Sequence, residues 1–119
     1  MHAFIIEDEY LIGQSLQDML SQLGFTKFSF ARSEDAAVMG ANAQEIDLIS
    51  ADVRLLPGVG VIAVEAICTR RDTPVIYITG YAEELEDRLP DAVVVQKPVR
   101  QEELATAVRQ VLHRHHHSN

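Results

Sequence analysis

The sequence predicts an α/β domain whose parallel strands alternate with helices along the chain. Two observations support this prediction: five short apolar runs are separated by helix-length intervals, and four of the runs end in polar residues. The carboxyl ends of parallel strands lie at one edge of a sheet, so the polar residues are expected to gather there. In chain order they are Glu7 with Asp8, Asp52, Thr79 and Lys97.

Size and charge exclude several classes of protein. The 119 residues and 47% hydrophobic content suit one domain with a core. The net charge of -8, without a basic cluster, argues against nucleic-acid binding. No apolar run approaches the roughly 18 residues of a membrane span and no secretory signal is present, so we expect a cytoplasmic protein. The single cysteine, Cys68, rules out an intrachain disulfide and is expected to be buried.

The first half of the chain is expected to hold two strands and two helices, followed by a third strand. A strand is predicted over residues 2–6 and a helix directly after it, because apolar residues recur every three or four positions until Gly24 stops the pattern. Residues 26–31 alternate phenylalanine with polar neighbours, which predicts a second strand near an edge of the sheet. Ser33 and the two acids after it indicate the start of a second helix. Residues 46–52 are apolar enough to form the central strand.

The second half continues the alternation. A third helix is expected over residues 61–70, and the clearest buried strand over 74–79. Residues 82–89 then leave room for only about two turns of a highly charged helix, which we expect to be short and weakly held. A fifth strand is predicted over 92–96 and a last helix, with one apolar stripe, over 101–112.

We place the domain over residues 1–113 and interpret residues 114–119, which are rich in histidine, as a disordered tail. Histidine-rich tracts bind metals in some proteins. A frayed natural terminus or part of a cloning tag is the favoured explanation of this segment, so we assign it no function.

The polar residues at the strand ends share one chemistry. Burying three carboxylates together costs free energy unless a cation compensates them, so Glu7, Asp8 and Asp52 imply a metal ion. Carboxylates without supporting His or Cys favour Mg²⁺, which shares its ligand shell with phosphate oxygens. At the end of the central strand, Asp52 is placed to act as a nucleophile that forms an aspartyl phosphate. Thr79 would hydrogen-bond one phosphoryl oxygen, and Lys97 would bring positive charge to another.

Taken singly, each of these residues also has an ordinary structural explanation. An acid in the first turn of a helix is favoured by the helix dipole, a threonine is a common strand residue, and a lysine is usually a solvated charge. Their joint order at the ends of four predicted strands favours a shared site.

At these residues the sequence resembles the receiver domain of two-component response regulators, over essentially the whole chain. The resemblance implies a flavodoxin-like (βα)5 fold with strand order 2-1-3-4-5 and helices on both faces. It implies that Asp52 is the phosphoacceptor, that Thr79 and Lys97 occupy the family's hydroxyl and lysine positions, and that the Lys97-Pro98 bond is cis. The Mg²⁺ ligands that it implies are Glu7, Asp8, Asp52 and the backbone carbonyl of Arg54.

Three positions depart from the usual receiver pattern. The Phe or Tyr that turns inward on phosphorylation is replaced by Val94, and the proline after the phosphoacceptor comes one residue late, as Pro57. Tyr81, two residues beyond Thr79, takes a position that influences access to the acyl phosphate. We expect Tyr81 either to substitute for the missing switch aromatic or to cover the site.

Residues 77–82 partly match a receiver subclass named FAT GUY after its Phe-Ala-Thr-Gly-X-Tyr motif. Thr79-Gly80 agree, Tyr77 replaces the Phe, and the second Tyr comes one place early. A short fourth helix and a Gln-Lys-Pro sequence without the switch aromatic fit the same subclass. Its members are largely stand-alone receivers paired with histidine kinases of the HWE type, which is what the resemblance implies for this chain.

The favoured function is a single-domain response regulator that receives a phosphoryl group on Asp52 from a sensor histidine kinase. It would then bind a downstream protein, relay the group to a phosphotransfer protein, or drain the kinase. We expect a monomer that is not an enzyme and binds neither nucleic acid nor membrane. One alternative is a small Mg²⁺-dependent aspartyl-phosphate phosphohydrolase, although Val53-Arg54 supply no general acid beside the nucleophile. The other is an interaction module that works without phosphorylation, which the intact acid set disfavours.

Overall fold

The secondary structure follows the predicted alternation of strands and helices. The computed structural model describes residues 1–32, 45–52 and 73–117. The helices predicted after Ser33 and over 61–70, and with them Arg54, Pro57 and Cys68, lie outside the described residues. None of the described helices is both long enough and apolar enough to cross a membrane.

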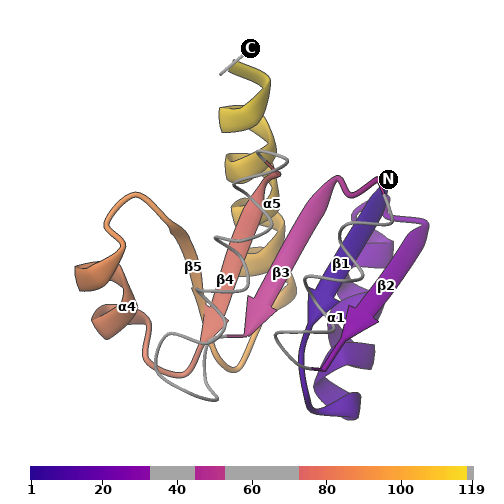
Figure 1. Cartoon of the computed structure of the whole chain (residues 1–119), viewed down its shortest axis with the longest axis horizontal. Helices are drawn as coiled ribbons and strands as arrows, with labels where there is room; N and C mark the ends of the chain where they lie inside the picture. The colour runs from indigo at the N-terminus through magenta and orange to yellow at the C-terminus, as the bar shows by residue number, and fades with distance from the viewer. Residues whose placement is uncertain (33–44, 53–72, 118–119) are drawn as a thin grey trace.

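Five strands form one parallel sheet in the order β2-β1-β3-β4-β5 (Figure 1). The predicted fold class and strand order are therefore confirmed, with β2 at one edge and β3 in the centre. All five residues of β3 are buried, whereas in β2 only Ala31 is. The strands span His2–Ile6 (β1), Lys27–Ala31 (β2), Leu48–Asp52 (β3), Val75–Thr79 (β4) and Val93–Gln96 (β5).

The first helix, α1, spans Tyr10–Gln22 and ends where Gly24 was expected to stop it. Gly24 has a φ of 100°, a conformation that glycine adopts without steric cost. Its N–H donates to the carbonyl of Ser21 (3.2 Å) and that of Phe25 to the carbonyl of Leu20 (3.2 Å), which together form a Schellman cap. The cap turns Phe25 into the core and directs the chain into β2.

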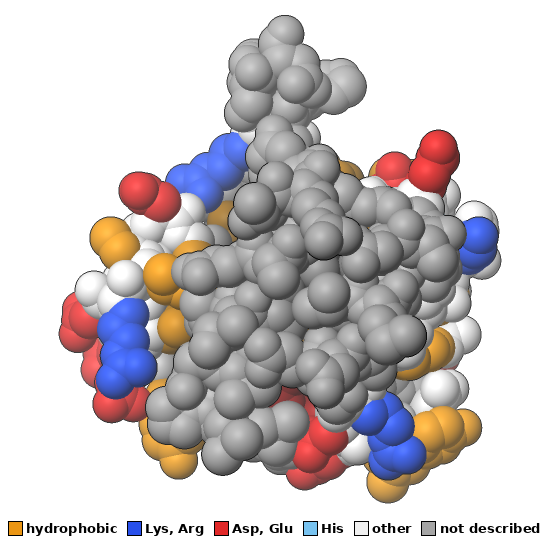
Figure 2. Space-filling model, viewed as in Figure 1, with side chains coloured by type: hydrophobic (Ala, Val, Ile, Leu, Met, Phe, Trp, Pro, Cys, Tyr) orange, Lys and Arg blue, Asp and Glu red, His pale blue; other side chains and the backbone are white. Residues whose placement is uncertain are grey.

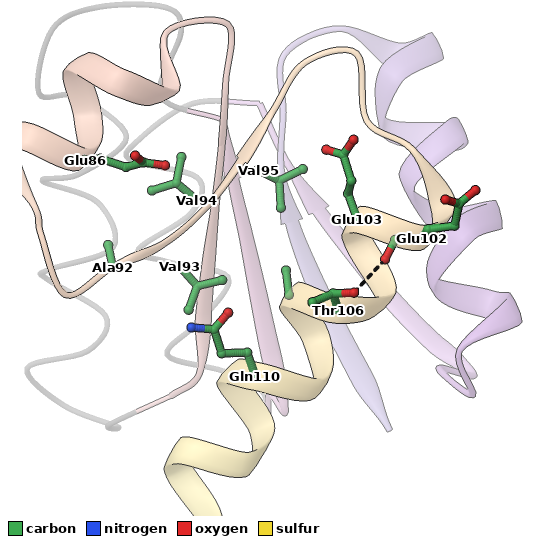
Figure 3. A pocket seen from close by; sticks show the side chains of 10 residues that line it. Glu86, Ala92, Val93, Val94, Val95, Glu102, Glu103, Thr106 and Gln110 are labelled. Atoms are coloured by element: carbon green, nitrogen blue, oxygen red, sulfur yellow. Dashed lines mark hydrogen bonds between the residues drawn. The ribbon is translucent and has the colours of Figure 1, made fainter.

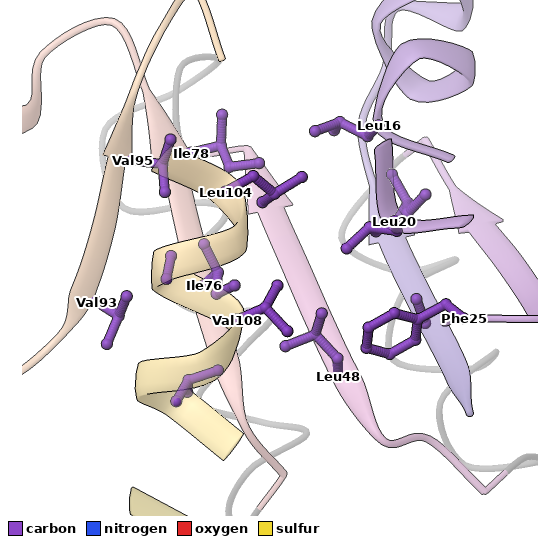
Figure 4. Close-up of a cluster of buried hydrophobic side chains, with 14 residues drawn as sticks. Leu16, Leu20, Phe25, Leu48, Ile76, Ile78, Val93, Val95, Leu104 and Val108 are labelled. Carbon is purple, nitrogen blue, oxygen red and sulfur yellow. The ribbon is translucent and has the colours of Figure 1, made fainter. Parts of the chain in front are cut away.

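Each face of the sheet carries its own hydrophobic core, because alternate residues of a strand point to opposite faces. On one face, α1 and α5 (Gln101–His117) pack against β1, β3, β4 and β5 (Figure 4); this cluster includes Ile5, Leu20, Leu48, Ile78 and Leu104. The cluster on the other face includes Phe4, Ile49, Tyr77 and, from α4, Leu85. Helices thus lie on both faces.

The helix α4 is short, as predicted, and spans Ala82–Arg88, roughly two turns. Leu85 is its only buried residue, and Leu89, just beyond the helix, packs against the same cluster. Acids dominate the rest of the helix, so α4 contributes little apolar surface to the core. It lies beside β4 and β5, next to the edge of the sheet (Figure 1).

The last helix is longer than predicted, because α5 continues to His117 instead of ending at Leu112. The prediction ended the helix where its apolar stripe ends. The extension has a tertiary contact, since Arg114 Nη1 donates to the carbonyl of Asp91 at 2.7 Å. The expected disordered tail is therefore helical as far as His117, and residues 118–119 lie outside the described residues.

Candidate functional site

Three carboxylates meet at the carboxyl edge of the sheet. Glu7 and Asp8 follow β1, and Asp52 is the last residue of β3, the strand beside β1. One carboxylate oxygen from each residue lies within 4.8 Å of the others. Glu7 and Asp52 are buried and Asp8 is partly buried. Acidic side chains are visible at the lower edge of Figure 2, the edge toward which the strands of Figure 1 point.

Lys97 brings an ammonium group into this set of acids. Its Nζ donates to Asp52 Oδ2 at 3.1 Å and lies 3.7 Å from Glu7 Oε1. The backbone places it there: Lys97 N–H donates to the carbonyl of Thr79 (2.9 Å), which extends the pairing of β4 with β5 by one residue. The following bond, to Pro98, is cis, the isomer that the resemblance implies. One ammonium faces three carboxylates here, so these four side chains together remain negative when ionised.

Glu7 shows how incompletely the negative charge is compensated. Its Oε2 accepts the N–H of Glu9 at 3.0 Å, at the start of α1, whereas its Oε1 is buried without a hydrogen-bond partner in the part of the chain that the structure describes. Burial, together with the neighbouring carboxylates of Asp52 and Asp8, raises the pKa of Glu7 from 4.5 to about 7. A buried, unsatisfied carboxylate oxygen beside two other acids suits a hard divalent cation, so the residues present fit Mg²⁺.

Thr79 ends β4, the strand next to β3, and is buried. Its Oγ1 accepts the N–H of Tyr81 at 3.0 Å. A hydroxyl that accepts one hydrogen bond still has its own proton, so Thr79 can still donate a hydrogen bond to a phosphoryl oxygen. Tyr81 itself is 66% exposed and stands at the N-cap of α4, while Val94 packs in the core cluster that contains Leu85.

Gln96 has a structural role that the sequence did not reveal. It is the last residue of β5 and directly precedes Lys97. Its Nε2 donates to the carbonyls of Gly80 (2.9 Å) and Lys97 (3.1 Å), and its Oε1 accepts the N–H of Ala82 (3.0 Å). Its place before the Lys-Pro pair was the only feature of the sequence that could have indicated this role, because a glutamine at the end of a strand is common.

The chain matches the response regulator receiver domain over residues 3–109. It belongs to that family. Among curated proteins, this receiver is similar to the phyllosphere-induced regulator PhyR of Methylorubrum extorquens, with 32% identity over 112 residues, which cover 91% of this chain and 42% of PhyR.

Two solved structures of PhyR proteins resemble the receiver closely. The PhyR receiver domain of Erythrobacter litoralis gives a TM-score of 0.83 at 33% identity and covers 94% of this chain and 89% of that one. The anti-anti-sigma factor PhyR of Bartonella quintana gives 0.87 at 29% identity and covers 98% of this chain and 49% of that one. The receiver thus spans less than half the length of the Methylorubrum and Bartonella proteins.

Proposed function

We propose that this receiver accepts a phosphoryl group on Asp52 from a phosphorylated histidine of a sensor histidine kinase. The observation that supports this most directly is the contact between Lys97 Nζ and Asp52 Oδ2 at 3.1 Å, within a group of three buried or partly buried acids. The subclass resemblance makes an HWE-type kinase the expected donor. Receivers are signalling domains, so the phosphorylated protein acts through a partner.

In the transfer, a carboxylate oxygen of Asp52 attacks phosphorus. The new bond joins that oxygen to phosphorus, the bond from phosphorus to the donor's histidine nitrogen breaks, and the released imidazole takes a proton from solvent. Lys97 lies against Asp52 and stabilises negative charge on the phosphoryl group, and the Thr79 hydroxyl donates a hydrogen bond to it.

Glu7, Asp8 and Asp52 would hold Mg²⁺, and the carbonyl of Arg54 is the fourth ligand implied by the family. When bound, Mg²⁺ supplies positive charge that offsets the repulsion between the phosphoryl oxygens and the carboxylates. The chain's own part is to present Asp52 at the end of β3 and to hold Glu7 and Asp8 beside it.

For the output partner, we place the binding surface on a groove of about 500 Å³ along β5, between α4 and α5 (Figure 3). Its floor is apolar and contains Val93, Val94 and Val95, and acids line its rim: Glu86, Glu102 and Glu103. An apolar segment flanked by basic residues would complement this surface. Because a related PhyR is an anti-anti-sigma factor, an anti-sigma factor is the first partner to test.

Substitution of the phosphoacceptor tests the proposal. Asp52→Asn removes the nucleophilic carboxylate, and we expect complete loss of phosphorylation by acetyl phosphate and Mg²⁺, measured as the mass gain of one phosphoryl group. Asp18→Asn, an exposed acid on α1, makes the same chemical change away from the site and should label as the unmodified chain does. Normal labelling of Asp52→Asn would contradict the assignment.

A further inference from the structure

The helix α4 begins without a capping side chain of its own. The first N–H groups of a helix have no partner within the helix, and Tyr81, the N-cap residue, makes no side-chain hydrogen bond to them. The N–H of Ala82 instead donates to Gln96 Oε1 at 3.0 Å. Gln96 lies on β5, 14 residues further along the chain, so the cap of α4 is supplied by a neighbouring strand.

The same amide holds the turn between β4 and α4. Gln96 Nε2 donates to the carbonyl of Gly80 at 2.9 Å and to that of Lys97 at 3.1 Å. A flipped amide would set its NH₂ group against the N–H of Ala82 and its oxygen against two carbonyls, so the three hydrogen bonds select one orientation. The turn after Thr79 and the start of α4 are thus fixed to β5 by one side chain.

These hydrogen bonds continue to the phosphoacceptor. Thr79 Oγ1 accepts the N–H of Tyr81 (3.0 Å), and the carbonyl of Thr79 accepts the N–H of Lys97, whose Nζ contacts Asp52. A threonine hydroxyl has one proton and two acceptor positions, so Thr79 can donate to a phosphoryl oxygen and still hold Tyr81. A shift of Thr79 toward Asp52 therefore pulls on the turn that Gln96 holds.

The geometry points to Gln96 as a positioning residue that couples the occupancy of Asp52 to the position of α4. The inference rests on the proposed phosphorylation of Asp52. Without a phosphoryl group, the hydrogen bonds through Gln96 hold the turn and α4 in one arrangement. A phosphoryl group that draws Thr79 toward Asp52 works against them and shifts α4 to a second arrangement.

The test uses Gln96→Met, which keeps the side-chain length and removes all three hydrogen bonds. The measurement is the NMR amide shift of residues 86–88, the last turn of α4, before and after loading with Mg²⁺ and beryllofluoride as a phosphoryl analogue. Loading should shift these signals in the unmodified chain. In Gln96→Met the unloaded signals should already lie toward the loaded positions, so the loading response falls by about twofold or more.

Two further variants make the result interpretable. Gln22→Met, an exposed glutamine at the end of α1, should respond as the unmodified chain does. Gln96→Glu keeps an oxygen that accepts the N–H of Ala82 but loses the hydrogen bonds to the carbonyls of Gly80 and Lys97, so this variant should also reduce the loading response. If Gln96→Met does not fold, Gln96→Glu takes its place in the test. A full response in the Gln96 variants would overturn the inference. If loading left the amides of Asp52 and Thr79 unchanged in the unmodified chain, the proposed phosphorylation would be wrong instead.

Discussion

At the amino end of the sheet, the buried ring of His2 has a hydrogen-bond partner at each nitrogen, whereas at the carboxyl end a buried carboxylate oxygen has none among the described residues. The backbone N–H of His2 donates to Asp47 Oδ2 (2.7 Å), and its buried ring contacts the carbonyl of Glu45 (2.5 Å) and Ser29 Oγ (2.8 Å). A carbonyl only accepts, so Nδ1 carries a proton and donates it to Glu45. At the other end of β1, directly after the strand, Glu7 Oε1 is buried without a hydrogen-bond partner among the described residues.

The difference separates polar groups that stabilise the fold from polar groups that we propose bind a ligand. This network ties β1 to β2 and to the segment before β3, and it occupies both ring nitrogens of His2. The acids at the carboxyl end repel one another, and binding of a cation relieves this unfavourable free energy. Substitutions at the two ends should therefore affect different measurements.

The largest effect is expected from Lys97→Met. The ammonium is the one cationic side chain that the structure describes in contact with Asp52, and in the proposed transfer its charge would stabilise the phosphoryl group. Loss of such a preorganised charge typically costs between about 100-fold and 1000-fold in rate, so phosphorylation by acetyl phosphate should slow by that factor. Lys27→Met, on the exposed edge of β2, is the matched control. A rate within a few-fold of the unmodified chain would show that Lys97 is only a solvated charge.

A pH effect on stability should follow from Glu7. Its pKa of about 7 lies above the ordinary value of 4.5, so the folded state binds the proton more tightly than the unfolded state. Without metal, the free energy of unfolding should fall by up to about 3 kcal/mol as the pH rises from about 4.5 to 7. Above pH 7 it should stay level. Urea unfolding in the presence of EDTA at several pH values measures this change in the free energy of unfolding.

The control for this effect is Glu7→Gln, which removes the titrating group and should flatten the pH profile. Saturating Mg²⁺ should also oppose the loss in the unmodified chain, because the ion binds the ionised carboxylates. If the metal-free chain were equally stable at pH 5 and pH 8, the carboxyl end would not hold an uncompensated acid.

A smaller loss of stability is expected at the amino end, from His2→Ala. The substitution removes a buried ring and leaves the Glu45 carbonyl and Ser29 hydroxyl without that partner, at a cost of about 2 kcal/mol by urea unfolding. Mg²⁺ affinity should not change, because the network lies at the opposite end of β1. His113→Ala, on the exposed surface of α5, should cost less than about 0.5 kcal/mol. Weakened Mg²⁺ binding in His2→Ala would show that the two ends are coupled.

The contrast between the ends also explains what the sequence revealed. The strands and the grouping of Glu7, Asp8 and Asp52 were predictable, because apolar runs and their polar ends are local patterns and parallel strands align those ends. The network of His2 was not predictable, since it depends on which residues the strand register brings together. The cap that Gln96 supplies to α4 and the contact of Arg114, on α5, with Asp91 likewise join segments distant in the chain.

The smallest effect is expected midway along the sheet, at Ser50. Its Oγ is buried and, like Glu7 Oε1, has no hydrogen-bond partner among the described residues, yet it lies too deep in β3 to meet a ligand. Ser50→Ala should therefore stabilise the fold, by about 0.5–1 kcal/mol in urea unfolding, because it removes a desolvation cost. The same change at Ser29, whose hydroxyl contacts His2, should destabilise by about 1 kcal/mol. If the two serine substitutions change the free energy of unfolding in opposite directions, hydrogen-bond satisfaction, and not burial alone, separates structural from binding polar groups in this sheet. Equal losses of stability would remove that distinction.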